Sequence, residues 1–351
     1  MKNEVTLTFG LPTYNRSVEI KDAIDSIVTQ MDDRSRSRIE ILICDDASTD
    51  NTAEVAKQYI ERYPDICRYH RNERNLRYSG NVHQVFLQAK GRFVIPFADD
   101  DALEPGALNR ILMVLDKYPD LGVAYLGSTS YDCTLSHRLD AQADSKRVPD
   151  ANTPINERFF KNGIESERQA GVLVEALVST NVIRRDLWLA EDLSPYYEGA
   201  IIHMPATARI LVNHSVCLVD EPLVKYRAGY GVRWSKVKGF PFNFHFDLVE
   251  FWDRERDLYP LDIQRAQHYE NVRGVIDALF RAKCANWPID YEYFSEKAKK
   301  TCNTGFWTWR KLMLLVRCPA VLFKLSYKTA LCVMRLMRTV ELRKLACPSK
   351  R

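Results

Sequence analysis

The sequence lacks the glycine-rich loops through which two common nucleotide-binding folds hold phosphate groups. No GxGxxG follows the first predicted strand and no GxxxxGK(S/T) occurs, so neither a dinucleotide-binding Rossmann site nor a P-loop is supported. The nine cysteines form no CxxC pair, and none stands beside histidines at metal-ligand spacing. This pattern argues against a zinc site and a disulfide framework, and it favours a reducing, cytosolic setting.

Long apolar runs are also missing. The N-terminal stretch MKNEVTLTF has no apolar core of the kind a signal peptide needs. In residues 306–345, basic side chains interrupt the apolar ones every few positions, so no run reaches the roughly 18 to 20 residues that span a bilayer. The 351 residues, 46% of them hydrophobic, are enough for one large domain or two smaller ones.

The net charge of +4 hides an uneven distribution. Residues 301–351 carry eleven basic side chains and one Glu, a balance of +10, while the other 300 residues carry 39 basic and 45 acidic ones, a balance of −6. The mixture of aromatic, leucine and basic residues predicts an interfacial helix on an anionic membrane leaflet. The alternative is a pair of basic helices packed on the body of the protein. Nucleic-acid binding is not expected, because no recognised module accompanies the charge.

Apolar patterning predicts strands that alternate with helices in the first 125 residues. The predicted strands are 5–11, 39–44, 66–71, 93–97 and 123–126, and the predicted helices are 17–31, 52–63, 81–89 and 107–115, with 76–80 as a loop. This alternation implies right-handed βαβ units and a mostly parallel α/β sheet.

Three consecutive carboxylates, Asp99, Asp100 and Asp101, follow the strand at 93–97. Residues 13–16 and the pair Asp45 and Asp46 follow two other strands, so all three groups are expected at the same edge of the sheet, where open α/β sheets bind ligands. Adjacent like charges repel, and a divalent cation with oxygen ligands, Mg²⁺ or Mn²⁺, would relieve the repulsion. The alternative is a solvated acidic loop.

The second half of the chain is less regular. Residues 132–170 are polar and are predicted to be flexible or inserted, 217–224 is predicted to be an edge strand because of Pro222, and 205–212, 246–252 and 262–283 are predicted helices. Residues 227–246 are rich in glycine, arginine and aromatics and predict a loop over the site. In it, Arg227 and Arg233 would suit a diphosphate and Trp234 a sugar face.

Four motifs in order resemble a known family: LPTYNR (11–16), ICDDASTDNT (43–52), RNERNLRYSGN (71–81) and GRFVIPFADDDALEPGAL (91–108). They resemble the motifs of the family-two, inverting GT-A-type glycosyltransferases that build bacterial surface polysaccharides, over roughly residues 5–125. The resemblance implies a GT-A catalytic domain at 1–245, with a Rossmann-like nucleotide-sugar-binding half (1–125) and an acceptor half (126–245). A helical, basic, amphipathic region would follow at 246–351.

The resemblance also implies roles for individual residues. Those expected to line the nucleotide pocket are Pro12, Thr13, Tyr14, Arg16, Asn75 and Gly80, and either Asp45 or Asp46 would accept a hydrogen bond from the base. The acidic triplet occupies the DxD position that binds the ribose and the metal-bridged diphosphate. Ala98 stands where the first acid of this motif is common, so Asp100 is the preferred metal ligand, with Asp99 and Asp101 assisting.

The general base is expected about a hundred residues beyond the first metal motif, often as Glu-Asp before a helix. Four residues are candidates: His203, Asp192, Glu198 and Glu191. His203 is preferred, since histidine titrates near neutrality and resembles the His found there in a subgroup that transfers deoxy sugars.

The implied activity is Mn²⁺- or Mg²⁺-dependent transfer of a hexosyl or deoxyhexosyl residue from a nucleotide sugar to a glycan. The acceptor would be a lipid-linked oligosaccharide of O-antigen or capsule synthesis, and the enzyme would be peripheral on the inner face of a bacterial cell membrane. The alternatives are a nucleotidyltransferase, although LPTYNR lacks the glycine-rich, basic loop of that class, and a non-catalytic nucleotide-sugar-binding module at the membrane.

Overall fold

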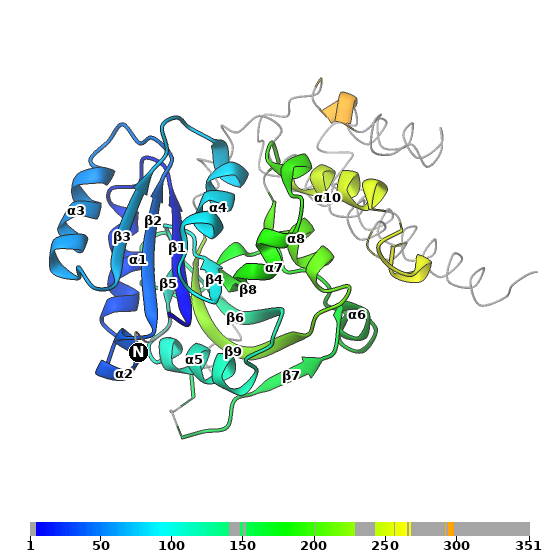
Figure 1. Ribbon diagram of the computed structural model, residues 1–351, viewed down its shortest axis with the longest axis horizontal. Helices are drawn as coiled ribbons and strands as arrows, with labels where there is room; N and C mark the ends of the chain where they lie inside the picture. The colour runs from blue at the N-terminus through cyan, green and yellow to red at the C-terminus, as the bar shows by residue number, and fades with distance from the viewer. Residues whose placement is uncertain are drawn as a thin grey trace, which may run out of the picture. The chain divides into compact units, whose positions relative to one another are not determined.

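A twisted sheet of nine described strands organises the first part of the chain (Figure 1). The computed structural model describes residues 5–139, 148–149, 152–199, 201–228, 243–255, 257–264, 267, 292 and 294–297. The strands are β1 (Leu7–Thr13), β2 (Ile39–Asp45), β3 (Cys67–Arg71), β4 (Phe93–Pro96), β5 (Ala102–Leu103), β6 (Val123–Tyr131), β7 (Glu157–Phe160), β8 (Asn181–Arg184) and β9 (Val216–Arg227). They pair in the order β3-β2-β1-β4-β8-β6-β9-β5, and β7 pairs with β9.

The parallel sheet predicted for the N-terminal half is confirmed. Strand β1 pairs in parallel with β2 and β4, and β2 pairs in parallel with β3. The helices within the described residues are α1 (Glu19–Val28), α2 (Asp33–Arg36), α3 (Thr52–Arg62), α4 (Arg77–Gln88), α5 (Ala107–Lys117), α6 (Gly163–Ala170), α7 (Arg185–Ala190), α8 (His203–Ile210) and α10 (Asn243–Arg254), with 3₁₀ helices η2 (Val178–Thr180) and η3 (Ser194–Tyr196).

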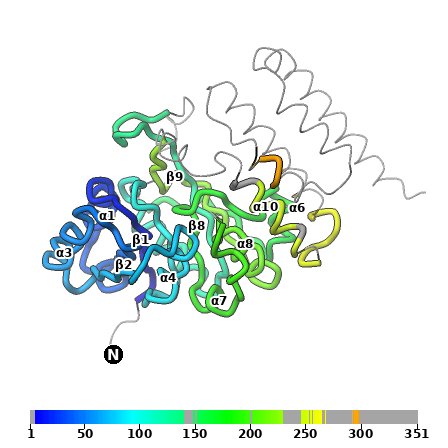
Figure 2. Tube along the Cα trace, turned by 90° about the horizontal axis from the view of Figure 1, so that it is seen from above, coloured from blue at the N-terminus to red at the C-terminus, as the bar shows by residue number. Residues whose placement is uncertain are grey.

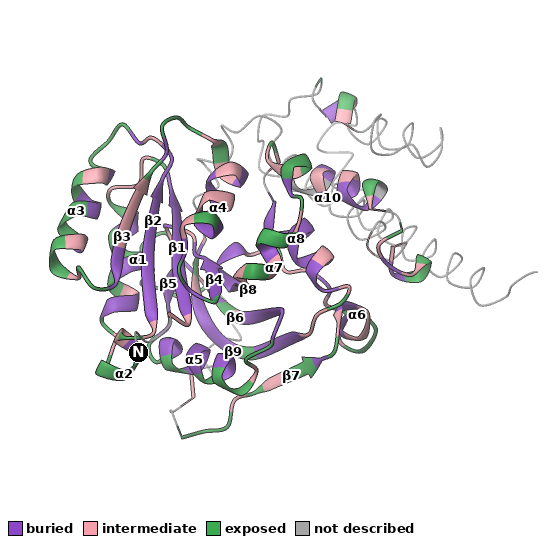
Figure 3. Cartoon of the chain, in the orientation of Figure 1, coloured by how far each residue is buried: buried purple, intermediate pink, exposed green. Residues whose placement is uncertain are grey.

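Side chains alternate along the strands and build a core on each face of the sheet. Leu7, Phe9 and Leu11 of β1 belong to the core that includes α1, α3 and α5. The opposite core joins β2, β4 and β6 to α4, α7 and α8. Strands β1, β2 and β4 are buried on both faces (Figure 3), and α4 and α7 lie side by side (Figure 2). On β1, a Cβ at Gly10 would lie 2.0 Å from Val85 Cγ1 of α4, so glycine permits the close approach of this helix.

Beyond β4 the sheet is mixed, and the prediction of an edge strand at 217–224 is wrong. Strand β9 pairs in parallel with β6 and lies antiparallel to β7 and β5 on its other side. The register between β6 and β9 shifts at Gly127, which is opposite Pro222. Such an irregularity accommodates a proline inside a sheet, since the missing N–H is not required there.

Two further boundaries differ from the prediction. Residues 157–170 are not an irregular insertion, because they form β7 and α6. Helix α4 begins at Arg77, inside the predicted loop 76–80. Its first N–H groups are satisfied by side chains, since Asp46 Oδ1 accepts from Leu76 N and Asn75 Oδ1 accepts from Arg77 N.

The chain divides into two units, Met1–Gly231 with Arg256–Ile263 and Val232–Glu255 with Gln264–Arg351. In the second unit, α10 confirms the predicted helix at 246–252. The Phe246 and Phe294 rings are 5.4 Å apart, and Lys297 pairs with Glu250. Most of the predicted helix 262–283 and all of the basic region 301–351 lie outside the described residues. Among the helices that are described, none combines the length and the apolar character needed to cross a membrane.

Candidate functional site

The acidic turn, residues 99–101, follows β4 and is held in place through Asp101. Asp101 Oδ2 accepts a 2.6 Å hydrogen bond from Ser179 Oγ, and Oδ1 accepts a 3.0 Å hydrogen bond from Arg227 N. Both oxygens of this buried carboxylate are therefore engaged by η2 and β9. Asp101 thus orients the turn, which leaves Asp99 and Asp100 as the carboxylates that face Arg16.

Arg16 lies beside these two carboxylates. Its Nε is 3.7 Å from Asp99 Oδ1 and its Nη2 is 3.5 Å from Asp100 Oδ2. Burial, with a contribution from the Asp100 charge, raises the pKa of Asp99 to about 7, although Arg16 opposes the rise. Burial also raises the pKa of Asp100, and burial together with Asp100 raises the pKa of Asp101 to about 7. Arg16 therefore compensates the negative charge of the acidic turn only in part.

The acidic turn offers two carboxylates, Asp99 and Asp100, that could hold a divalent cation. Within the described part of the chain, no three His, Cys, Asp or Glu side chains converge on one metal position. Asp99 and Asp100 nevertheless offer hard oxygen ligands. Their raised pKa values show that their negative charges are unfavourable in this site, and a bound cation would stabilise those charges. Mg²⁺ is commonly held by one or two carboxylates together with substrate phosphates, so two carboxylates are sufficient.

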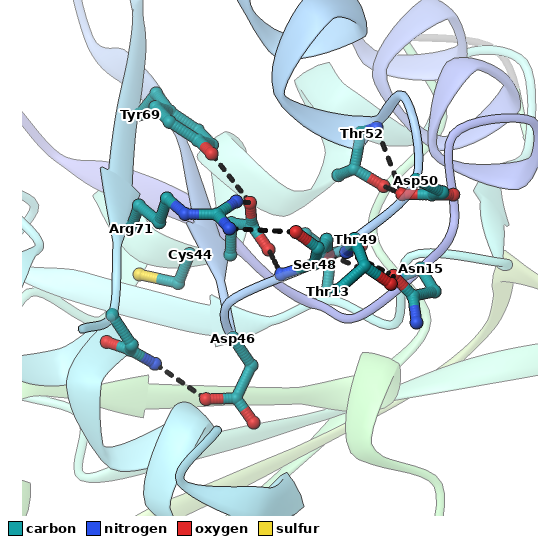
Figure 4. A network of polar contacts seen from close by, with 12 residues as sticks. Thr13, Asn15, Cys44, Asp46, Ser48, Thr49, Asp50, Thr52, Tyr69 and Arg71 are labelled. Atoms are coloured by element: carbon teal, nitrogen blue, oxygen red, sulfur yellow. Dashed lines mark hydrogen bonds and ion pairs between the residues drawn. The ribbon is translucent and has the colours of Figure 1, made fainter. Parts of the chain in front are cut away.

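Two loops at the same edge of the sheet interlock (Figure 4). Asn15 N donates to Ser48 Oγ over 2.9 Å, and Thr49 N donates to Asn15 Oδ1 over 2.7 Å. Asn15 has φ +54°, a left-handed conformation that asparagine tolerates better than most residues. Behind this loop, Pro12 and Thr13 are buried in β1, whereas Tyr14 is 48% exposed. The loop therefore presents an aromatic ring and the Arg16 guanidinium at the edge of the sheet.

Asp45 and Asp46 have different surroundings. Asp45 is fully buried: Oδ1 accepts from Ser48 N, and Oδ2 accepts from Tyr69 Oη and Arg71 Nη1 at 2.6 and 2.7 Å. Asp46 Oδ1 accepts from Asn72 Nδ2 and Leu76 N. No described residue donates to Asp46 Oδ2.

The Asp46 side chain points away from Tyr69 and Arg71 (Figure 4). Asp45 therefore fixes the loop after β2, while Asp46 keeps one oxygen for another donor.

The third motif contributes residues that the sequence analysis missed. Asn72 Nδ2 also donates to Asn81 Oδ1, and Asn81 Nδ2 donates to Cys44 O over 2.9 Å. Burial and the charges of the three carboxylates of the acidic turn raise the pKa of Tyr78. All three residues lie within RNERNLRYSGN, so the motif was the available signal. Of the predicted residues, Asn75 is exposed, and Gly80 is half-buried in α4.

His203 is the first residue of α8 and is 2% exposed. Its Nε2 lies 3.0 Å from Ala176 O, and no described residue hydrogen-bonds to its Nδ1. Burial lowers the pKa of His203 to about 4, although the Ala176 carbonyl opposes the shift. The imidazole is therefore neutral near pH 7, and a carbonyl partner at Nε2 requires the proton to be on that nitrogen.

The three carboxylate candidates already have protein partners. Asp192 accepts from Ser194 Oγ and N, and these hydrogen bonds lower its pKa. Glu191 Oε2 lies 2.9 Å from Arg209 Nε. Glu198 is exposed and pairs with Arg77 at the start of α4. Each of these carboxylates is engaged by a cation or by a local turn.

Arg227 does not lie in a loop, contrary to the prediction, because it is the last residue of β9 and is buried. Its guanidinium donates to Asp100 O, Cys133 O and Asp22 Oδ2 at 2.6, 2.7 and 2.5 Å. These contacts join α1, the acidic turn and the segment that follows β6, so Arg227 stabilises the turn. Arg233 and Trp234 lie outside the described residues.

Comparisons with known proteins agree with this architecture. Residues 8–177 match the family Glycosyl transferase family 2. The abequosyltransferase RfbV of Salmonella typhimurium is 26% identical over 269 residues, which are 76% of this chain and 79% of RfbV. The putative glycosyltransferase EpsE of Bacillus subtilis is 30% identical over 129 residues, which are 37% of this chain and 44% of EpsE.

Solved structures show the same fold at low identity. S. aureus TarS 1–349 superimposes with a TM-score of 0.53 at 17% identity, over 76% of this chain and 71% of TarS 1–349. The same protein is also known in complex with UDP-GlcNAc, with a TM-score of 0.53. The four ordered motifs, the sheet and these matches agree: residues 8–177 are a Glycosyl transferase family 2 domain, and the chain is a glycosyltransferase with the GT-A fold.

Proposed function

We propose that this glycosyltransferase moves a sugar, with inversion, from a nucleotide sugar to a hydroxyl group of a glycan, and that it requires Mn²⁺ or Mg²⁺. The observation that carries the proposal is the acidic turn: buried carboxylates with raised pKa values, at the carboxyl edge of the parallel strands, beside Arg16. Such a site is unfavourable without a cationic ligand and becomes favourable when one binds.

Asp100, with Asp99, would hold the cation, which when bound would stabilise the negative charge of the leaving diphosphate. Arg16 supports the same diphosphate, because its guanidinium already lies at the two carboxylates. Asp101 orients the turn and is not a ligand in this proposal. Tyr14 lies along the nucleoside, and Asp46 Oδ2 accepts a hydrogen bond from its base.

His203 is the proposed general base. Nδ1 carries the lone pair, since Nε2 donates to Ala176 O, and a neutral imidazole can take the proton of the attacking hydroxyl. The three carboxylate candidates are engaged elsewhere, as described above. Inversion follows from direct attack by that hydroxyl on the carbon that bears the diphosphate.

The similarity to an abequosyltransferase supports a hexosyl or deoxyhexosyl donor. The acceptor in this proposal is a lipid-linked oligosaccharide of O-antigen or capsule synthesis, as the resemblance of the four sequence motifs implies. A basic region at 301–351 would hold the catalytic domain, 1–245, at the inner face of the cell membrane. Vesicles with and without anionic lipid test this part of the proposal: cosedimentation that requires anionic lipid supports it, and no cosedimentation with either vesicle contradicts it.

The central experiment measures thermal stabilisation by UDP, GDP, dTDP and CDP, each with and without Mn²⁺, because a ligand that binds the native state raises its apparent stability. We expect one nucleotide to stabilise the protein in a metal-dependent way, and Asp100→Asn to lose that shift. The matched control is Asp220→Asn on β9, which removes the carboxylate of an exposed ion pair with Arg158 of β7. A metal-dependent shift that survives in Asp100→Asn would contradict the site, and nucleotide binding without sugar transfer would favour a non-catalytic module.

A further inference from the structure

The segment between α6 and β8 contacts both halves of the proposed reaction site. We call residues 175–180 the bridging segment. At its C-terminal end, the buried Ser179 hydroxyl accepts a 2.9 Å hydrogen bond from Ala98 N and donates the 2.6 Å hydrogen bond to Asp101 Oδ2. One hydroxyl group therefore fixes the acidic turn at two points, immediately before it and at its last carboxylate.

The other end of the bridging segment contacts His203. Ala176 O accepts the hydrogen bond from Nε2 and so selects the tautomer in which Nδ1 is the basic nitrogen. Ala176 itself is exposed, whereas the imidazole is buried. The orientation of the His203 ring therefore depends on where the bridging segment places one carbonyl group.

Internal hydrogen bonds make the bridging segment a single unit. Glu175 Oε1 accepts from Ala176 N and Leu177 N at 3.0 and 3.3 Å. Leu177 O accepts from Thr180 N, Thr180 Oγ1 and Asn181 Nδ2 at 3.1, 2.6 and 2.7 Å. These hydrogen bonds therefore connect Ala176 and Ser179 within one hydrogen-bonded segment.

We propose that Ser179 is a positioning residue that couples the donor pocket to the general base. Binding of the donor at the acidic turn moves Asp101, Ser179 follows Asp101, and the bridging segment carries the movement to the carbonyl that orients His203. This inference rests on the proposed function, since it needs a donor at the acidic turn. The role that it assigns to the bridging segment is to couple the acidic turn to His203.

The experiment follows the ring nitrogens of His203 by NMR in full-length protein labelled with ¹⁵N-histidine. The chain has seven histidines, and His203→Gln identifies the signal. The stabilising nucleotide is added with Mn²⁺ for the thermal measurement and with Mg²⁺, which is diamagnetic, for the NMR measurement. In the wild-type protein we expect the neutral tautomer protonated at Nε2, and a change in its shifts when the nucleotide and Mg²⁺ are added.

Ser179→Ala removes the coupling hydroxyl. Its matched control is Ser166→Ala, because Ser166 of α6 is equally buried and donates to Val172 O. We expect the nucleotide-induced shift of His203 to disappear in Ser179→Ala and to persist in Ser166→Ala. We also expect Ser179→Ala to lower kcat at saturating donor about tenfold. If Ser179→Ala does not fold, Ser179→Cys keeps the volume and weakens the hydrogen bond.

The outcomes separate this inference from the proposed function. Full thermal stabilisation by the nucleotide and metal with an unchanged His203 signal in wild-type protein overturns the coupling and leaves the donor site intact. An equal shift in wild type and Ser179→Ala also overturns it. If no nucleotide stabilises the wild-type protein, the donor site and the coupling both fail. If the shift is lost in Ser179→Ala while His203→Gln remains fully active, the coupling stands and the assignment of the base fails.

Discussion

Arg16 Nη2 lies 3.5 Å from Asp100 Oδ2, so a protein cation already occupies one side of the carboxylate to which we assign the metal. Arg16→Gln should therefore have opposite effects on the two ligands. Mn²⁺ should bind about tenfold more tightly, about 1.4 kcal/mol, because a repelling charge is removed. The nucleotide diphosphate should bind more weakly, because a guanidinium donor is lost. Calorimetric titration with each ligand measures both effects.

The control for Arg16→Gln is Arg36→Gln. This substitution breaks an exposed ion pair with Asp65, which is not part of the acidic turn. It should leave both affinities unchanged. Weaker binding of Mn²⁺ to Arg16→Gln would show that Arg16 supports the cation site and does not oppose it.

Asp45, the last residue of β2, should be a structural residue, and Asp46, the next residue, should be a binding residue. Asp45→Asn places an amide donor where both oxygens accept hydrogen bonds, so it should destabilise the protein by about 3 kcal/mol. Asp46→Asn can keep Oδ1 for its two donors, so stability should change by less than about 1 kcal/mol. Its affinity for the nucleotide should fall about tenfold. Urea unfolding and nucleotide titration of the pair provide the measurements, and equal nucleotide loss in both variants would contradict the assignment.

His203 should make the stability of the protein sensitive to acid. Burial lowers its pKa in the folded protein from 6.5 to about 4, so between those pH values the unfolded chain binds a proton that the folded chain does not. The free energy of unfolding should accordingly fall as the pH decreases from 6.5 to 4, by about 3 kcal/mol from this group. Other acids titrate in the same range, so the measured quantity is the wild-type pH profile minus that of His203→Gln. A flat difference would mean that His203 is solvated in the folded protein.

The three carboxylates near α8 should not be required for transfer. Asp192→Asn, Glu191→Gln and Glu198→Gln remove charges that are held by Ser194, Arg209 and Arg77. Each variant should retain kcat within about a factor of two, whereas His203→Gln should lose at least a hundredfold, the usual contribution of a positioned base. If one carboxylate variant loses activity while the other two and His203→Gln remain active, that carboxylate is the general base.

Sequence patterns predicted the N-terminal half well because each element there is local. Strands β1, β2 and β4 are mostly apolar and are buried along their length. The acids at the carboxyl ends of β2 and β4 are adjacent to one another in the sequence. The parallel order then brings these acids to one edge of the sheet without further information.

The remainder depends on pairings between distant residues. Arg227 reads as a loop residue in YRAGYG, yet β9 extends to it because β6 continues to Tyr131 and supplies the partner. Pro222 reads as an edge signal, yet a register shift opposite Gly127 admits it inside the sheet. The distinction between Asp45 and Asp46 depends on Tyr69 and Arg71 of the next strand. No spacing in the sequence specifies which oxygen these side chains reach.

The two hydrogen bonds to Asp101 come from residues 78 and 126 positions further along the chain, and this has a consequence for recombination. The family match ends at residue 177, before Ser179, β8 and β9. A chimera that exchanged only residues 8–177 between two relatives would join the donor pocket of one protein to the strands β8 and β9 of the other. Donor specificity should therefore transfer between such enzymes only when the exchanged part extends through Arg227.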